Sequence, residues 1–422
     1  MSVQAERLYY SDSYLKEFVS IVIDVKEDEG DTWVRLRESA FYPTSGGQPY
    51  DTGVLFIEGG SEAVRVTEVQ VEEGQVWHRL AGSLSVGQAV TGRIDWSRRF
   101  DFMQQHCGQH ILSACFEQAL GAKTSSFHMG DTYSSIDLDK DLTDDAVLLV
   151  MRRANEWIWR DVPVRARFVT EDELSTMKLR KAPSVKEDIR IVTIEGLEDN
   201  ACGGTHPAST GQVGQILITR TERMHGGTRV VFVCGGRALS TAKQAIDTLR
   251  GLANGLSVGP DDVPLAVTSL QEQFKESKRK YEALRGQYSG LLARDYVNTQ
   301  LQTIDSTCVL VAEIPDLDEV HELKRLASSS VTWIADAHPN APYIVVFVGG
   351  WMGRAHVVIQ AAENAPVAAN QLIQAALPPL NGKGGGTAVA AQGSAPVAVK
   401  EAADSLASCL RANLPSFSRE LH

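Results

Sequence analysis

Two short motifs, far apart in the sequence, most constrain what this chain can fold into. The first, "HCGQH", places His106 and His110 four residues apart, a spacing that puts two imidazoles on one face of a helix. The second, "CGGTH", places Cys202 and His206 around a Gly-Gly pair, which permits a tight turn. Thiolate and imidazole are ligands that Zn²⁺ prefers, and four of them can close a tetrahedron. A fold that uses both motifs must therefore bring a helix and a loop together at one point.

Each motif by itself has a simpler interpretation. Two histidines at this spacing also occur at a solvated helix edge or as a satisfied pair in a core. Cys202 alone would be a buried apolar thiol beside a structural turn. The occurrence of both motifs favours the metal site, because either one alone is much less specific. The six cysteines are spread through the chain, which favours a metal or catalytic use over a disulfide framework.

Composition and charge exclude several classes of protein. Of the 422 residues, 43% are hydrophobic and 22% are charged, as in globular proteins with two or three domains. The formal net charge of −12 argues against indiscriminate binding of polyanions, so a nucleic-acid partner requires local basic patches. The first residues lack a basic start followed by an apolar run, and no apolar stretch is long enough to span a bilayer. We therefore expect a cytoplasmic protein with no membrane partner.

The pattern along the chain predicts an α+β multidomain protein. Alternating apolar runs broken by Gly and Pro predict a small β-barrel-like unit over residues 1–95, with a glycine-rich loop or turn in "FYPTSGGQPYDTG". Mixed helical and strand-like patterns predict an α+β domain over 96–240, and apolar positions at three-and-four spacing predict a helical connector over 241–302. An α/β domain is expected over 303–422, with a glycine-rich loop in "LNGKGGGTAVAAQGSA". This loop is not a Walker A motif, because glycine follows Lys383.

The combination of "FYPTSGGQPYDTG", "HCGQH", "CGGTH" and "GKGGGTAVAAQG" resembles the editing half of alanyl-tRNA synthetase. It also resembles the freestanding relatives of that enzyme, the long-form alanyl-tRNA editing proteins with a C-terminal DHHA1 domain. The resemblance covers nearly the whole chain and implies a zinc-dependent trans-editing hydrolase that deacylates mischarged tRNA(Ala), chiefly the seryl and also the glycyl form. It implies a synthetase-type editing domain, a DHHA1-like domain that helps to hold the tRNA, and a homodimer through the helical connector and C-terminal domain. The Zn²⁺ ligands that it implies are His106, His110, Cys202 and His206.

The same resemblance indicates residues around the metal ligands. Two positions depart from the synthetase pattern: Gln109 stands where many synthetases have Thr, and His128 where they have Gln, unless His128 is a plain surface histidine. A glutamine at 109 would hydrogen-bond a seryl hydroxyl, or fill the pocket and favour glycine. Arg229 suits a phosphate or a buried carboxylate, since its guanidinium makes bidentate contacts, unless it is a plain surface arginine. The residues expected to act in catalysis are Thr44, Gln48, Gln109 and His128, and those expected to contact tRNA are Gly46, Gly47, Arg98, Arg99, Arg229 and Lys383.

Hydrolysis of an aminoacyl ester needs a positioned water and support for the developing oxyanion. Zn²⁺ activates a water or polarises the carbonyl only if a coordination position is open. With all four ligands bound, the ion would instead organise the pocket or recognise the amino group of the substrate by ligand exchange. Two rival functions stay open: a deacylase for another mischarged tRNA, and a non-catalytic zinc-stabilised tRNA-binding protein.

Overall fold

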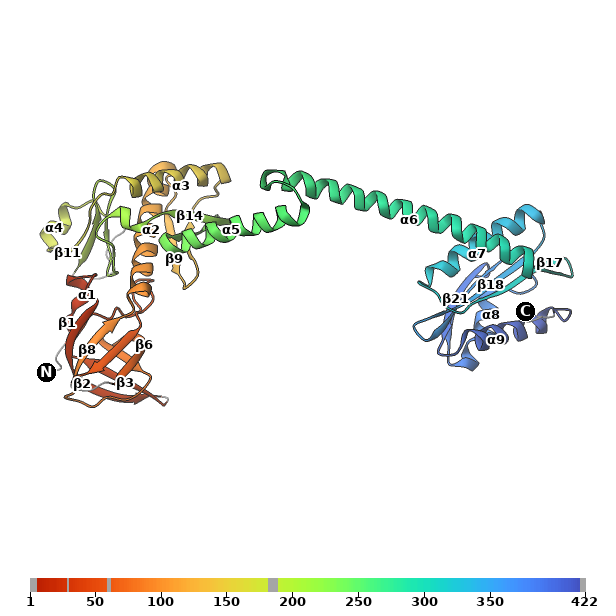
Figure 1. Ribbon diagram of the computed structural model, residues 1–422, viewed down its shortest axis with the longest axis horizontal. Helices are drawn as coiled ribbons and strands as arrows, with labels where there is room; N and C mark the ends of the chain where they lie inside the picture. Colours follow the sequence, from red (N-terminus) through yellow and green to blue (C-terminus); the bar gives the residue numbers. More distant parts are fainter. Residues whose placement is uncertain (1–5, 29, 59–61, 181–188, 418–422) are drawn as a thin grey trace. The chain divides into compact units, whose positions relative to one another are not determined.

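The chain divides into two compact units, residues 1–260 and 261–422, in the computed structural model (Figure 1). The structure describes residues 6–28, 30–58, 62–180 and 189–417. A multidomain α+β protein with a small barrel is confirmed. Within the described residues, no helix is long and apolar enough to cross a membrane.

The first unit begins with a closed barrel whose strands neighbour one another in the order β2-β3-β7-β6-β5-β8. Strands with a buried face alternate inward and outward residues, and β2 follows this pattern with Phe18, Ser20 and Val22 inside. Val34 of β3 and Leu55 of β5 contribute to the same core. The short elements β1 (Glu6–Arg7), α1 (Leu8–Ser11) and β4 (Glu38–Ser39) flank the barrel. The barrel strands are β2 (Glu17–Asp28), β3 (Asp31–Leu36), β5 (Gly53–Ile57), β6 (Ala63–Glu72), β7 (Gln75–Leu80) and β8 (Ala89–Ile94).

A long helix, α2 (Trp96–Leu120), follows the barrel and carries the first motif. It begins where the Asp95 side chain accepts the Arg98 N–H at 3.2 Å, and it ends at Gly121, whose φ of 62° favours glycine. Two antiparallel sheets lie beside it, in the orders β14-β15-β10-β9 and β11-β12-β13. The remaining elements of this unit are β9 (Thr124–Met129), β10 (Ser134–Leu138), α3 (Asp144–Trp159), β11 (Val164–Phe168), α4 (Glu171–Thr176), β12 (Arg190–Ile194), β13 (Glu198–Ala201), β14 (Ile216–Met224), β15 (Gly227–Cys234) and α5 (Gly235–Leu256).

The glycine inside "HCGQH" has a packing role. A Cβ added at Gly108 would lie 2.3 Å from the Cys234 Sγ at the end of β15, so no larger residue fits without a shift. One turn earlier, Gln105 accepts the Cys234 N–H at 2.8 Å and donates to the Cys234 carbonyl at 3.1 Å. These contacts fix the rotation of α2 about its axis, and with it the direction in which the two histidines point.

The second unit is a six-stranded sheet in the order β16-β17-β18-β19-β21-β20, with helices on both faces (Figure 1). β17 and β18 are parallel and are joined by α7, and the other neighbouring pairs are antiparallel. Helices α6 and α7 pack on one face and α8 and α9 on the other. The elements are α6 (Val263–Gln300), β16 (Gln302–Ile304), β17 (Thr307–Ile314), α7 (His321–Ala337), β18 (Tyr343–Trp351), β19 (Arg354–Ala361), α8 (Ala369–Ala376), β20 (Lys383–Gly386), β21 (Ala390–Ala395) and α9 (Val399–Asn413).

The glycine-rich segment near the C-terminus differs from the expected loop. It forms the paired strands β20 and β21. A Cβ at Gly384 would lie 2.5 Å from Ile373 Cγ2 of α8, and one at Gly393 would lie 2.4 Å from Leu377 Cδ1. The glycines therefore let this edge of the sheet pass close beneath α8, a close approach that the sequence pattern alone does not reveal.

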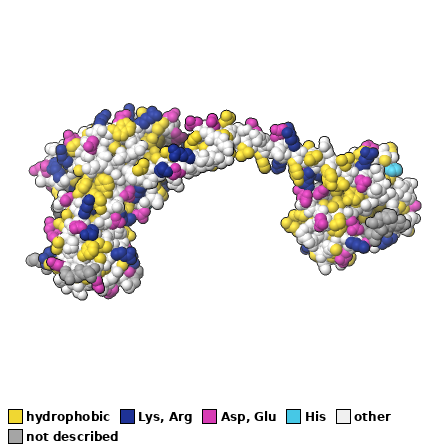
Figure 2. Space-filling model, in the orientation of Figure 1, with side chains coloured by type: hydrophobic (Ala, Val, Ile, Leu, Met, Phe, Trp, Pro, Cys, Tyr) yellow, Lys and Arg dark blue, Asp and Glu magenta, His cyan; other side chains and the backbone are white. Residues whose placement is uncertain are grey.

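The expected connector over residues 241–302 contains two helices that belong to different units, α5 to the first and α6 to the second. Both helices leave apolar side chains exposed, and Figure 2 shows hydrophobic side chains interspersed with charged ones over this part of the chain. On α6 these exposed residues recur at three-and-four spacing, which is typical of a helix with an apolar seam. The residues that follow this spacing are Val267, Leu270, Phe274, Tyr281, Leu284, Tyr288 and Leu291, and Leu265 near the start of the helix is exposed as well.

Candidate metal centre

The two motifs meet in the first unit. His106 and His110 point from α2 toward the loop after β13, which carries Cys202 and His206, and one ligand atom from each of the four lies within 4.8 Å of the others. The Cys202 Sγ lies 3.5 Å from His106 Nε2 and 3.3 Å from His206 Nε2. Bond lengths for thiolate and imidazole on Zn²⁺ imply a ligand-to-ligand edge of about 3.6 Å in a tetrahedron. The spacing of these donors therefore fits a tetrahedral metal ion.

The backbone of the "CGGTH" turn is shaped around the first histidine. A Cβ at Gly204 would lie 2.2 Å from the His106 Cε1, so this position must be glycine for the ring to occupy its place. Arg190, at the start of β12, donates to the carbonyls of Cys202 at 3.0 Å and of Gly204 at 2.8 Å. The guanidinium thereby holds both sides of the turn in place, with the Cys202 thiol directed toward α2.

Hydrogen bonds on the outer nitrogens orient both imidazoles of α2. The Gln48 Oε1 accepts the Thr205 N–H at 3.0 Å and lies 2.9 Å from His106 Nδ1, so the ring nitrogen donates to it. The Glu198 Oε1 lies 2.6 Å from His110 Nδ1. Because a carboxylate only accepts, that nitrogen donates as well. In both rings Nε2 is left facing the centre of the cluster.

The electrostatics of the cluster match this donor set. Burial would raise the pKa of the Cys202 thiol, but the His106 and His206 rings hold that pKa well below its ordinary value. Burial lowers the pKa of the His206 imidazole to about 3. Burial acts in the same direction on His110, but the Glu198 carboxylate outweighs it and raises the pKa of the imidazole to about 9. A metal requires the thiolate form of Cys202 and neutral imidazoles, so His110 must release a proton when a metal binds.

The glycine-rich loop of the barrel unit reaches the cluster through Gln48. Gly46 and Gly47 have φ values of 58° and 83°, and their turn brings Gln48 into a fully buried place, where its Nε2 donates to Thr205 Oγ1 at 2.7 Å. Thr44 lies on the exposed side of the loop, where its N–H donates to the Val69 carbonyl at 3.2 Å. Of the loop residues expected at the site, the structure brings Gln48 to the metal ligands.

Gln109 is buried on α2, directly before His110 in the sequence. Its Nε2 donates to Ser113 Oγ at 2.9 Å, and Thr124 Oγ1 donates to the same oxygen at 2.7 Å. These hydroxyls connect Gln109 to the start of β9, so the amide is held in one orientation.

His128 is not brought to the cluster, contrary to the expectation for it. Its neighbour Phe127 stacks on His106, with ring centroids 5.8 Å apart. Successive side chains of a strand point to opposite faces, so His128 is exposed on the other face of the sheet. There it lines a pocket of about 280 Å³ together with Arg229 and Tyr133.

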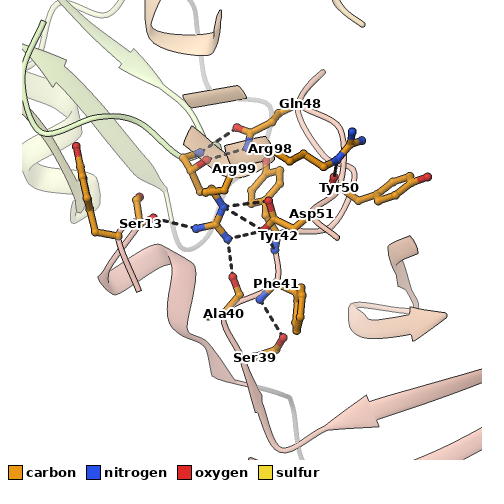
Figure 3. Close-up of polar contacts among 12 residues, drawn as sticks. Ser13, Ser39, Ala40, Phe41, Tyr42, Gln48, Tyr50, Asp51, Arg98 and Arg99 are labelled. Atoms are coloured by element: carbon orange, nitrogen blue, oxygen red, sulfur yellow. Dashed lines mark hydrogen bonds and ion pairs between the residues drawn. The ribbon is translucent and has the colours of Figure 1, made fainter. Parts of the chain in front are cut away.

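Arg99 is buried, whereas a residue that contacts tRNA must lie at the surface. Its side chain is 0% exposed, and Nε and Nη2 both donate to the Asp51 carboxylate, at 3.0 and 2.5 Å to Oδ2. Figure 3 shows the guanidinium enclosed between the barrel unit and the N-terminal segment, donating also to the carbonyls of Ser13 at 2.9 Å and Ala40 at 2.5 Å. The first turn of α2 inserts against the barrel, which buries this side of the helix. The expectation that Arg99 contacts tRNA is therefore wrong.

The other three cations expected to contact tRNA lie at the surface in different settings. Arg98 is partly exposed and donates to the Tyr50 carbonyl at 3.0 Å (Figure 3). It also donates to Asp131 Oδ1 at 2.9 Å. Arg229 makes a bidentate pair with the partly buried carboxylate of Asp137, at 2.7 and 2.9 Å. Lys383 is exposed on β20 in the second unit.

Several residues that shape the site carry little signal in the sequence. Arg190, Glu198 and Thr205 contact the ligands or their turn, and Asp51 anchors the loop that carries Gln48. Glu198 and Thr205 lie within four residues of Cys202, so a polar side chain so close to a predicted ligand is a usable signal. Arg190 and Asp51 become recognisable only when the fold is known.

Comparison with known proteins places this geometry in context. Residues 189–231 match the family described as the threonyl and alanyl tRNA synthetase second additional domain, and residues 5–98 match class II (A) tRNA synthetases. The alanyl-tRNA editing protein AlaX-L of Pyrococcus horikoshii is 30% identical over 415 residues, covering 97% of this chain and 99% of that protein. The alanine–tRNA ligase of Pyrococcus abyssi is 30% identical over 406 residues, covering 92% of this chain and 42% of the ligase. The chain therefore spans less than half of the length of that ligase.

A solved structure also matches part of the chain. The C-Ala domain of Aquifex aeolicus alanyl-tRNA synthetase covers 28% of this chain and 98% of its own, at 21% identity and a TM-score of 0.22.

Proposed function

The chain belongs to the long-form alanyl-tRNA editing proteins, and from this membership we propose that it hydrolyses mischarged tRNA(Ala), releasing serine or glycine. The observation that carries the proposal is the convergence of His106, His110, Cys202 and His206 at tetrahedral spacing, with the buried amide of Gln48 beside them. We take the metal to be Zn²⁺, because one thiolate and three imidazoles are the donors that this ion prefers.

The side chains around the cluster contribute to the proposed reaction by holding the metal-binding residues in place. A bound Zn²⁺ supplies Lewis acidity toward the ester or an activated water if a position is open, and otherwise organises the pocket. Gln48 ties His106 on α2 to Thr205 in the "CGGTH" turn, so it fixes the two ligand-bearing segments against each other. We assign Gln48 this positioning role within the catalytic site.

The contacts of Gln109 support a role for this residue in selecting the amino acid that the tRNA carries. Because its Nε2 is held by Ser113, its carbonyl oxygen is the atom that remains to accept a hydrogen bond from the hydroxyl of a seryl ester. A site that binds a hydroxyl in this way discriminates against a substrate that lacks it. On this basis we propose seryl-tRNA(Ala) as the preferred substrate, with glycyl-tRNA(Ala) as the alternative.

The tRNA would be held by exposed parts of both units. In the first unit, the turn at Gly46 and Gly47 leaves backbone and the Thr44 hydroxyl exposed beside the loop that carries Gln48, and Arg98 is partly exposed nearby on α2. In the second unit, Lys383 lies on an exposed strand of the domain that we take to be DHHA1-like. The apolar seam of α6 would pair with a second copy of the chain, because unpartnered seams of this spacing bury their side chains by helix pairing.

The test is deacylation of tRNA(Ala) charged separately with serine, glycine and alanine. We expect release of serine or glycine, sparing of alanine, and loss of activity in the H106A/H110A double variant. His225→Ala is the matched control, because His225 is an exposed histidine at the turn between β14 and β15. Binding of tRNA without release of any of the three amino acids would favour a non-catalytic metal-stabilised tRNA-binding protein or a deacylase for another tRNA.

A further inference from the structure

A buried carboxylate lies directly behind one ligand of the metal centre. The side chain of Glu198, the first residue of β13, is 3% exposed, and its two oxygens have different partners. Oε1 lies 2.6 Å from His110 Nδ1, and Oε2 accepts a hydrogen bond from the Nε of Arg180. The three side chains thus form a chain of contacts that ends on the metal-facing imidazole.

This arrangement determines which nitrogen of His110 faces the cluster. A carboxylate accepts hydrogen bonds and cannot donate them, so His110 Nδ1 must carry its proton toward Glu198. The lone pair available for a metal is then on Nε2, the nitrogen that faces Cys202 and His206. Partners of this kind fix the orientation of a ligating imidazole and make it a stronger ligand.

Arg180 fixes the carboxylate in turn. Its side chain is 12% exposed, and its backbone N–H donates to the Asp199 carbonyl at 3.1 Å, so the segment that carries it is attached to β13. With one oxygen held by Arg180, Glu198 cannot rotate away from His110 without losing a charged hydrogen bond in a buried place.

We propose that Glu198 is a positioning residue that sets the metal affinity of this site by holding His110 with Nε2 toward the ion, and that Arg180 holds Glu198 in place. The inference rests on the proposed metal centre and deepens it. It assigns to a residue outside the four ligands a defined contribution to metal binding.

Glu198→Gln is the sharpest perturbation, because it keeps the shape of the side chain and removes one acceptor. If the amide oxygen of the glutamine accepts from His110, its NH₂ group faces the Arg180 donor. If the oxygen turns to Arg180, the NH₂ group donates to His110 Nδ1 and forces the proton onto Nε2, where the metal should bind. Neither orientation satisfies both neighbours.

The experiment measures Zn²⁺ affinity of the full chain by competition with a chelator of known affinity. We expect E198Q to weaken binding by about 10- to 100-fold, the range for partners of metal-bound histidines, and Arg180→Gln to weaken it less. Asp199→Asn is the matched control, because Asp199 lies next along β13 and bonds Thr193 Oγ1 at 2.5 Å, away from the ligands. A nitrogen-15 NMR spectrum of the zinc-loaded protein reports independently which nitrogen of His110 carries the proton.

The outcomes separate this inference from the proposed function. Equal zinc affinity of E198Q and wild type, with the Nδ1 proton of His110 unchanged, overturns the role of Glu198. Absence of zinc binding by the wild type overturns both the metal centre and this role. Weakened zinc binding by E198Q in a protein that releases no amino acid from tRNA(Ala) supports the role of Glu198 and refutes the proposed reaction. If E198Q does not fold, the Arg180→Gln variant decides. Unchanged zinc affinity of that variant overturns the proposed role of the contacts that run from Arg180 through Glu198 to His110, and weakened zinc affinity supports that role.

Discussion

Replacing Arg99 by methionine should strongly destabilise the first unit, although Arg99 lies next to a surface arginine in the sequence. The guanidinium donates to both oxygens of Asp51, at 3.0 to 3.1 Å from Nε, and to two backbone carbonyls. Both side chains are 0% exposed. Removal of one partner of a buried ion pair costs about 3–5 kcal/mol, because the other charge stays buried without compensation. That loss is a large fraction of the 5–15 kcal/mol by which domains are typically stable.

The assay is urea unfolding followed by tryptophan fluorescence, with Arg98→Met as the matched control. Arg98 pairs with Asp131, which is 72% exposed, so its ion pair should contribute about 1 kcal/mol or less. The double variant R99M/D51L should recover much of the loss, since it no longer contains an unpaired buried carboxylate. Equal free energies of unfolding for R99M and R98M would refute the argument.

The same variant tests whether Arg99 contacts tRNA. Because the side chain is buried, R99M should bind tRNA with wild-type affinity at temperatures where it is folded. Weaker tRNA binding together with unchanged stability would restore Arg99 as a residue that contacts phosphate.

Three further predictions concern stability and metal binding. Burial lowers the pKa of His78 to about 4, so only the unfolded chain binds this proton between about pH 6.5 and 4. The free energy of unfolding should therefore fall by about 3 kcal/mol across that range, and His78→Phe should remove this part of the pH dependence. Gly108→Ala should destabilise the first unit by about 1–3 kcal/mol in urea unfolding, because its Cβ meets Cys234; a neutral effect would show that α2 can shift. Gly204→Ala should displace the His106 ring and weaken zinc affinity in the chelator competition, and unchanged affinity would contradict the packing described for the turn.

Local patterns were sufficient for much of the fold, and they predicted the four side chains that come together in a group able to hold a metal ion. The alternation of apolar residues predicted the barrel strands, and the four-residue spacing within "HCGQH" predicted one helical face for the two histidines. Such patterns work because the period of a helix or strand is a property of the backbone itself. The glycine-rich segment containing Lys383 was predicted as a loop and forms a strand, because its glycines serve close packing under α8, which no local pattern encodes.

By itself, the sequence determined which side chains share a face of one element and which chemistry they offer together. Only the tertiary structure decided which face of each element is buried and which residues of other elements contact that face. Arg98 and Arg99 are neighbours on α2, yet one is partly exposed and the other is enclosed, because a helix turns its successive side chains in different directions and the barrel covers only one of them. The partnership of Glu198 with His110 arises in the same way, since contacts between distant elements follow from how their surfaces pack.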